Sequence, residues 1–188
     1  MFEQLLEAIA RGLERLSIPY MLIGGQAVLL YGEPRLTRDI DITLGAGPER
    51  LPEIVEWVRG NGWQVLVEAP AEFVEKTMVL PCLEPTSGIR MDFIFSFSPY
   101  EQQALKRAQR VPIGGAQVCF VSLEDLIIHK VLAGRPHDLE DVRSVLLKNQ
   151  AFDLEYVHRW LREFDRSLGE KSLERFEKVR QAPPKAQN

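Results

Sequence analysis

The sequence predicts a mixed α/β (α+β) protein, in which a small mixed β-sheet flanked by helices is followed by a C-terminal helical portion. Two observations support this fold class. Short apolar runs typical of buried strands alternate with helical patterns up to residue 121, and the segments after residue 122 have helical patterns. We therefore expect a sheet-containing core over residues 1–121, helices packed on it over 122–180, and a disordered tail at 181–188.

The elements before residue 96 follow from apolar spacing and from glycine and proline breaks. Apolar residues at positions 2, 5, 6, 9, 13 and 16 recur at helical spacing, and Pro19 ends that helix. Apolar runs bounded by turn residues predict strands. The expected elements are helices over Phe2–Leu16, Gln26–Tyr31 and Pro48 to about Gly60, and strands over Tyr20–Ile23, Asp39–Leu44, Trp63–Val67, Phe73–Leu80 and Ile89–Phe95, the last two separated by a turn-rich Pro81–Gly88.

The later elements are expected to be helices. Ser98 and Glu101 have the spacing of a capping box, which predicts a helix from Ser98 to about Arg110. A second such start at Ser122 opens the helical portion. The helices expected there cover Ser122–Leu132, His137–Leu147 and Asp153–Phe164.

Composition limits the classes of function. A chain of 188 residues, 45% apolar, can bury one sizeable core. Its apolar runs are far shorter than the ~20 residues of a membrane span, and its N-terminus has mixed charge, so we expect a cytoplasmic protein without a membrane partner. The net charge of −4 argues against a general nucleic-acid-coating surface. A local basic groove stays open at either of two clusters, although solvated surface charge is favoured for the first: Lys106, Arg107 and Arg110, or Arg35, Arg38 and Arg135.

The segment from Ile23 to Leu44 contains the most informative pattern. A glycine pair, Gly24-Gly25, ends a strand and opens a helix, and Asp39 and Asp41 follow on the next strand. Side chains two residues apart on a strand point to the same face, so the two carboxylates project together. Mg²⁺ is typically held by one or two carboxylates plus substrate phosphates. Each feature alone is more often a plain turn or a solvated strand, but the combination favours metal-assisted phosphate chemistry.

The same residues resemble a known family. The run GGQAVLLYGEPRLTRDIDITL is similar to the nucleotidyltransferase superfamily of the DNA polymerase β type, whose signature is a Gly-Gly or Gly-Ser turn followed by an Asp-x-Asp strand. A third carboxylate on a neighbouring strand completes the metal triad of that family, and Asp92 in IRMDFIF matches it. Gly25 replaces the serine of many members, so phosphate binding would depend on backbone amides.

A second segment, SLEDLIIHKVLAGRPHDLEDVRSVLL, resembles the helical part of the abortive-infection (AbiEii-like) toxin nucleotidyltransferases. Lys130, Arg135 and Asp138 match a lysine, an arginine and an aspartate that recur in that branch. The resemblance implies that these three residues bind nucleotide or phosphate, together with Gly24 and Gly25. The toxin branch also implies an RNA or tRNA end, or a protein, as the acceptor, and an antitoxin as a partner.

The implied activity is metal-dependent nucleotidyl transfer. With Mg²⁺ or Mn²⁺ as cofactor and an NTP as substrate, a nucleoside monophosphate would move to an acceptor hydroxyl, and pyrophosphate would leave. The resemblance assigns to Asp39 and Asp41 the cation that bridges the nucleotide phosphates. It assigns to Asp92 a second cation beside the attacking hydroxyl, and Asp92 could also receive the proton.

Two alternatives stay open. One is a catalytically silent nucleotide-binding module, or a partner protein of a toxin–antitoxin pair, although the presence of all three aspartates weighs against it. The other is a haloacid-dehalogenase-like phosphatase, because DIDIT also fits the nucleophile motif of that class. That class places its motif directly after a buried apolar strand, whereas PRLTR precedes the motif here, so this alternative ranks lower.

Overall fold

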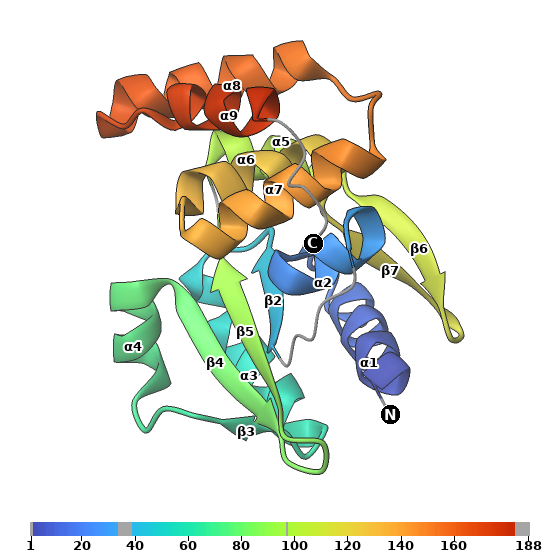
Figure 1. Cartoon of the computed structure of the whole chain (residues 1–188). Coiled ribbons are helices and arrows are strands. Elements are labelled where there is room, and N and C mark those ends of the chain that lie inside the picture. The colour runs from blue at the N-terminus through green and yellow to red at the C-terminus, as the bar shows by residue number, and fades with distance from the viewer. Residues whose placement is uncertain (1, 34–38, 97, 183–188) are drawn as a thin grey trace. The chain divides into compact units, whose positions relative to one another are not determined.

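A computed structural model describes residues 2–33, 39–96 and 98–182. The chain divides into two compact units, one made of Met1–Ala27 and Leu36–Ser122, the other of Val28–Arg35 and Leu123–Asn188. The first unit contains a seven-stranded mixed sheet, counted over the residues described, and the second contains the C-terminal helices (Figure 1). The predicted mixed α/β class with a C-terminal helical portion is confirmed.

The sheet has the order β3-β4-β5-β2-β1-β7-β6. The pairs β2–β5 and β1–β7 are parallel, and the other neighbouring strands are antiparallel. The strands are β1 (Tyr20–Ile23), β2 (Asp39–Leu44), β3 (Gln64–Val65), β4 (Val79–Glu84), β5 (Ile89–Phe95), β6 (Gln109–Ile113) and β7 (Ala116–Phe120). The helices in the same part of the chain are α1 (Phe2–Arg15), α2 (Gly24–Tyr31), the short 3₁₀ helix η1 (Pro48–Arg50), α3 (Leu51–Gly60), α4 (Pro70–Thr77) and α5 (Pro99–Lys106).

One face of the central strands is the core of the first unit. Ile40 and Ile42 of β2 and Phe93 of β5 are fully buried. Trp57 of α3 packs edge-on against Phe93, with ring centroids 5.6 Å apart, so α3 covers this face. Full burial of one such side chain stabilises the fold by roughly 1.5–3 kcal/mol. Because alternate strand residues point in opposite directions, the apolar face leaves the intervening polar residues of β2 and β5 on the other side of the sheet.

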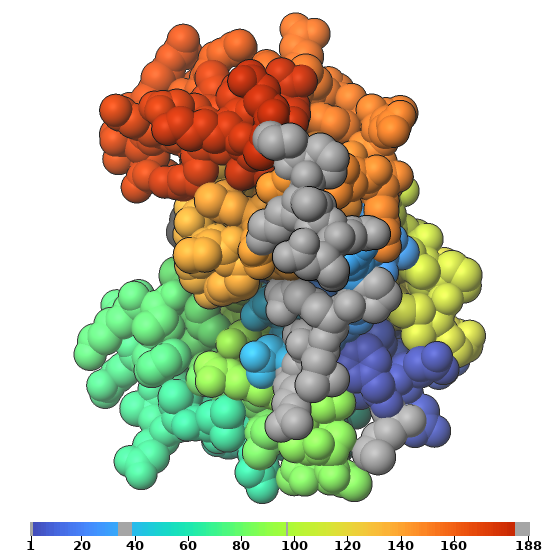
Figure 2. Space-filling model, in the orientation of Figure 1, coloured from blue at the N-terminus to red at the C-terminus, as the bar shows by residue number. Residues whose placement is uncertain are grey.

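The second unit is helical. Its elements are α6 (Leu123–Ala133), α7 (Pro136–Lys148), α8 (Leu154–Leu168) and α9 (Ser172–Gln181). The side chains of α8 and α9 lie together in the space-filling view (Figure 2), and Leu161 and Phe176 are fully buried. Asp153 caps α8 by accepting a hydrogen bond from the Tyr156 N–H at 2.9 Å. Within residues 2–33, 39–96 and 98–182, no helix is long and apolar enough to cross a membrane.

Most of the predicted elements are confirmed, several to within a residue. The strand predicted over Phe73–Leu80 is wrong, because Pro70–Thr77 forms α4 and the strand β4 begins only at Val79. Proline fits the first turn of a helix, because the N–H groups of that turn have no hydrogen-bond partner within the helix and the absence of one costs nothing. The predicted turn at Pro81–Gly88 is also too long. Pro81 lies within β4 and accepts a hydrogen bond from the Leu66 N–H, so it takes part in the sheet as an acceptor.

The region after Ser98 also differs in part. The capping box is confirmed, since the Ser98 hydroxyl accepts from the Glu101 N–H at 3.2 Å and the Glu101 carboxylate accepts from the Ser98 N–H at 3.3 Å. However, this helix ends at Lys106 rather than near Arg110, because Gln109–Ile113 pairs with β7. The hairpin β6–β7 and the helix α9 were not predicted. Gln181, the first residue of the predicted disordered tail, is the last of α9, and residues 183–188 lie outside the described residues.

Candidate active site

The register of β2 and β5 places the three predicted aspartates on one face of the sheet. Asp41 and Asp92 are direct partners on these parallel strands, and Asp39 is the partner of Arg90. Paired residues of neighbouring strands share a face, and residues two apart on one strand also do. Asp39 is exposed, whereas Asp41 and Asp92 are half-buried. The sheet therefore brings together the carboxylates that the sequence separates by about fifty positions.

The glycine turn lies directly against this carboxylate face. Ile23, the last residue of β1, is the partner of Asp41, so Gly24 follows at the same level of the sheet. A Cβ on Gly24 would lie 2.0 Å from Asp41 Oδ2, and the φ of Gly24 is +65°. Both the backbone conformation and the close approach therefore require glycine. Gly25 is buried in the first turn of α2.

Arg90 is a further residue of this face that the motifs did not identify. Its Nε donates to Asp92 Oδ1 at 3.0 Å, and its side chain is 50% exposed. The hydrogen bond to Asp92 raises the pKa of Arg90, and the negative charges of Asp92, Asp39 and Asp41 add to the effect. A signal was present in the sequence, because Arg90 precedes Asp92 by two residues and so projects from the same side of the strand.

The donor set of this face fits a hard divalent cation. Carboxylate oxygens are the ligands that Mg²⁺ prefers, and one or two carboxylates are sufficient when substrate phosphates supply the rest. Over the described part of the chain, however, no three His, Cys, Asp or Glu side chains are grouped closely enough to hold a metal ion. Asp92 is instead engaged by Arg90. Asp39, Asp41 and Asp92 therefore share a face and carry the type of oxygen ligand that such a cation prefers, and their role as metal ligands stays a prediction.

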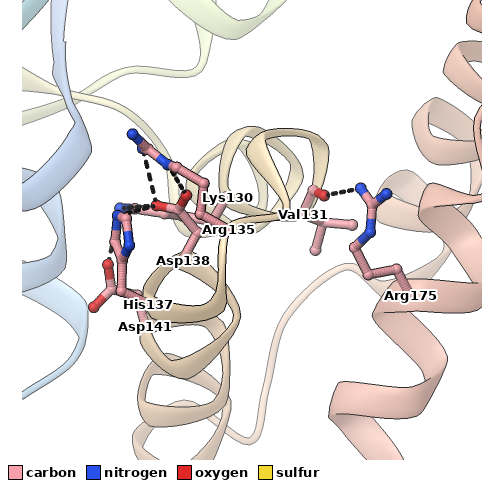
Figure 3. A network of polar contacts seen from close by, with 7 residues as sticks. All are labelled: Lys130, Val131, Arg135, His137, Asp138, Asp141 and Arg175. Carbon is pink, nitrogen blue, oxygen red and sulfur yellow. Dashed lines mark hydrogen bonds and ion pairs between the residues drawn. The ribbon is translucent and has the colours of Figure 1, made fainter.

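The other predicted site residues form a charge network within the second unit (Figure 3). Lys130 Nζ of α6 lies 2.8 Å from Asp138 Oδ1 and 2.8 Å from Asp141 Oδ2, both on α7. Arg135 Nε donates to Asp138 Oδ2 at 2.5 Å, and His137 Nε2 lies 3.5 Å from Asp138 Oδ1. The network thus joins the lysine, arginine and aspartate of the resemblance and adds Asp141 and His137.

Asp138 is the centre of this network. Its side chain is fully buried, and burial alone would raise its pKa. The hydrogen bonds from Arg135 and Lys130 outweigh burial, so the pKa of Asp138 lies below its ordinary value. The Lys130 side chain is 7% exposed and its charge is compensated by two carboxylates, whereas the Arg135 side chain is 62% exposed. Arg135 is therefore the cation of the network most accessible to an anion, and the predicted nucleotide-binding roles of Lys130, Arg135 and Asp138 stay predictions.

The basic clusters of the sequence fall in different places. Lys106 and Arg110 are both exposed and line a cavity of about 510 Å³ in the first unit, together with Tyr20 and Cys119. Arg35 and Arg38, of the second cluster, lie outside the described residues. Both cysteines of the chain are free thiols.

Comparison with known proteins adds a family model and several solved structures. The model described as nucleotidyltransferase of unknown function (DUF6036) matches residues 1–182. No curated protein matches the chain.

Two solved structures are similar over most of their length. One is an antigenic nucleotidyltransferase-like protein from Paracoccidioides brasiliensis, with 16% identity, a TM-score of 0.56, and coverage of 93% of this chain and 91% of that chain. The other is ANT(2'')-Ia in complex with adenylyl-2''-tobramycin, with 21% identity, a TM-score of 0.60, and coverage of 89% and 98%. At these identities the likeness shows a common fold.

Proposed function

The chain belongs to the family of nucleotidyltransferases of unknown function (DUF6036), and from this membership we propose that it moves a nucleoside monophosphate from an NTP to an acceptor hydroxyl and releases pyrophosphate. The observation that carries the proposal is the carboxylate face of the sheet. Asp41 and Asp92 are partners across β2 and β5, Asp39 shares their face, and Gly24 leaves no room for a side chain beside Asp41 Oδ2.

Each residue of this face has a role in the proposed reaction. Asp39 and Asp41 would hold a Mg²⁺ or Mn²⁺ ion, which would supply positive charge for the nucleotide phosphates. Asp92 would hold a second cation, and its carboxylate accepts the proton of the acceptor hydroxyl as that hydroxyl attacks the α-phosphorus. When bound, these cations would stabilise the charge of the leaving pyrophosphate and lower the pKa of the acceptor hydroxyl. The backbone at Gly24 and Gly25 can approach the phosphates closely, and the N–H groups of the first turn of α2 favour an anion there.

The acceptor is the open part of the proposal. The resemblance to toxin-type enzymes supports an RNA or tRNA end, or a protein, and would bring an antitoxin as partner. The similar structure that contains adenylyl-2''-tobramycin supports a hydroxyl of a small aminoglycoside-like molecule. A fold does not choose among acceptors. All three classes should therefore be tested in parallel.

The direct experiment measures pyrophosphate release and label transfer. Purified protein with Mg²⁺ or Mn²⁺ is incubated with each of the four labelled NTPs and with total RNA, protein and small-molecule fractions, including an aminoglycoside. We expect labelled product in one fraction and loss of that product in Asp41→Asn, because that variant removes a cation-holding charge without changing the size of the side chain. Glu72→Gln is the matched control, because it removes an exposed carboxylate from α4, and it should keep full activity.

Two outcomes would contradict the proposal. Full transfer by a folded Asp41→Asn variant would exclude Asp41 from the cation site. Calorimetry that detects nucleotide binding, combined with no transfer to any fraction, would instead support the silent nucleotide-binding module.

A further inference from the structure

Arg90 lies on the same sheet face as the three aspartates. It is the partner of Asp39 across the parallel strands, and it pairs with Asp92 through a 3.0 Å hydrogen bond. It therefore adds a positive charge to a face that also carries three carboxylates. The same contact engages Asp92, and among the described residues no three His, Cys, Asp or Glu side chains lie close enough together to hold a metal ion.

We propose that Arg90 is a built-in countercharge of the aspartate cluster. A divalent cation must displace Arg90 from Asp92, and the triphosphate of an incoming metal–nucleotide complex then binds the displaced guanidinium. This inference rests on the proposed function, because it assigns to Arg90 control over how the metal enters that same site. Arg90 is a positioning residue in this role, since it acts through Asp92.

The geometry allows Arg90 to leave Asp92 without disturbing the core. Its side chain is 50% exposed, whereas its strand neighbour Met91 is fully buried and points to the opposite face. An exposed ion pair of this kind is weak, so a divalent cation can compete with it. The Asp92 side chain is 21% exposed, and its carboxylate can turn toward the cation when the guanidinium leaves.

The consequence is a preference for metal that arrives with phosphate. A free cation that enters this face meets a guanidinium of like charge, and this repulsion weakens its binding. A triphosphate brings its own negative charge, and a guanidinium binds phosphate oxygens through two parallel N–H groups as well as it binds a carboxylate. Arg90 can then exchange Asp92 for phosphate, so the repulsion is relieved.

The first test measures binding of Mn²⁺ alone to the whole protein, by electron paramagnetic resonance of the free ion. We expect Arg90→Gln to bind Mn²⁺ about three- to tenfold more tightly than the original protein, because one like charge is removed. Arg90→Lys keeps the charge and should remain close to the original affinity. Arg180→Gln is the matched control, because Arg180 forms an ion pair with Glu177 of similar exposure, and it should change nothing.

The second measurement uses the complex of Mn²⁺ with inorganic tripolyphosphate. If Arg90 passes from Asp92 to phosphate, the advantage of Arg90→Gln over the original protein should disappear or reverse with this probe. The same advantage with and without tripolyphosphate would overturn the phosphate part of the proposal.

A third measurement needs no metal. In the presence of EDTA, Arg90→Gln should lower the melting temperature, because Asp92 loses its ion pair with Arg90, and Asp92→Asn in the same chain should remove most of that loss. Equal Mn²⁺ affinities of Arg90→Gln and the original protein, or an unchanged melting temperature in EDTA, would overturn the countercharge. Failure of the proposed function alone would look different: the protein would release no pyrophosphate, but its Mn²⁺ affinity would still respond to Arg90.

Discussion

Replacement of Gly24 by alanine is the sharpest perturbation of the candidate active site. The added methyl group would lie 2.0 Å from Asp41 Oδ2, although side-chain Cβ atoms in proteins essentially never approach another atom more closely than 3.0 Å. The Asp41 carboxylate or the backbone at Gly24 must therefore move by at least about 1 Å. Because Asp41 is a proposed cation ligand, this movement affects the chemistry directly.

Two costs can be separated in this variant. The φ of +65° at Gly24 is a left-handed conformation, which costs an L-residue roughly 1–2 kcal/mol. For a protein of this length, that corresponds to a fall in melting temperature of about 2–8 °C. The second cost is the displacement of the carboxylate, and a misplacement of about 1 Å at a reacting centre can lower the rate about 100-fold.

Gly88 provides a matched control for the first cost. Its φ is +69°, and nothing lies within 4 Å of the position that its Cβ would take. Gly88→Ala should therefore lose a similar amount of stability and keep its metal affinity and nucleotidyl transfer. Gly24→Ala should lose at least as much stability and about 100-fold in transfer rate. Thermal unfolding, Mn²⁺ binding and pyrophosphate release measure the three quantities.

The comparison of the two variants can refute the reasoning. If Gly24→Ala unfolds at the same temperature as Gly88→Ala and keeps full Mn²⁺ affinity and nucleotidyl transfer, the close approach of Gly24 to Asp41 does not matter for metal binding or for the reaction. If both variants lose transfer equally, the loss comes from general destabilisation rather than from the carboxylate.

The charge network of the second unit gives two further predictions. Lys130→Met should lower the free energy of unfolding by about 3–5 kcal/mol in urea denaturation, because two buried carboxylates lose a shared partner. A loss below about 1 kcal/mol, the size expected for an exposed ion pair, would show that Lys130 and its carboxylate partners are not effectively buried. The pKa of Asp138 is lower in the folded protein than its unfolded value of about 3.9, so its contribution to stability is present at neutral pH and is lost as the pH falls below about 4 toward the folded pKa. Asp138→Asn should therefore show a flatter acid limb in the pH dependence of unfolding, and an unchanged acid limb would contradict the assignment.

Local pattern was sufficient for much of the first unit. Tyr20–Ile23 and Ile89–Phe95 were predicted with their observed boundaries, because short apolar runs between turn residues are typical of buried strands. The prediction failed at Phe73–Leu80, where α4 packs its buried Val74 while its other face is exposed to solvent. A helix of only eight residues, such as α4, contains too few apolar residues to show a helical period. The hairpin β6–β7 was missed because β6 has no buried residue and β7 buries only Val118 and Phe120, so neither strand has a continuous apolar run.

Local sequence pattern was enough to predict the chemistry of the candidate site. The types and spacing of Gly24, Asp39 and Asp41 place two carboxylates on one strand face after a glycine turn, because strand geometry has a fixed period of two. The family resemblance had also indicated Asp92, but how Asp92 and Arg90 come to lie beside this pair depends on the assembled sheet. The parallel register of β2 and β5 sets Asp92 beside Asp41 and brings Arg90 into the cluster. Register depends on how whole strands bury their apolar faces, and this is a property of the assembled sheet rather than of any local segment.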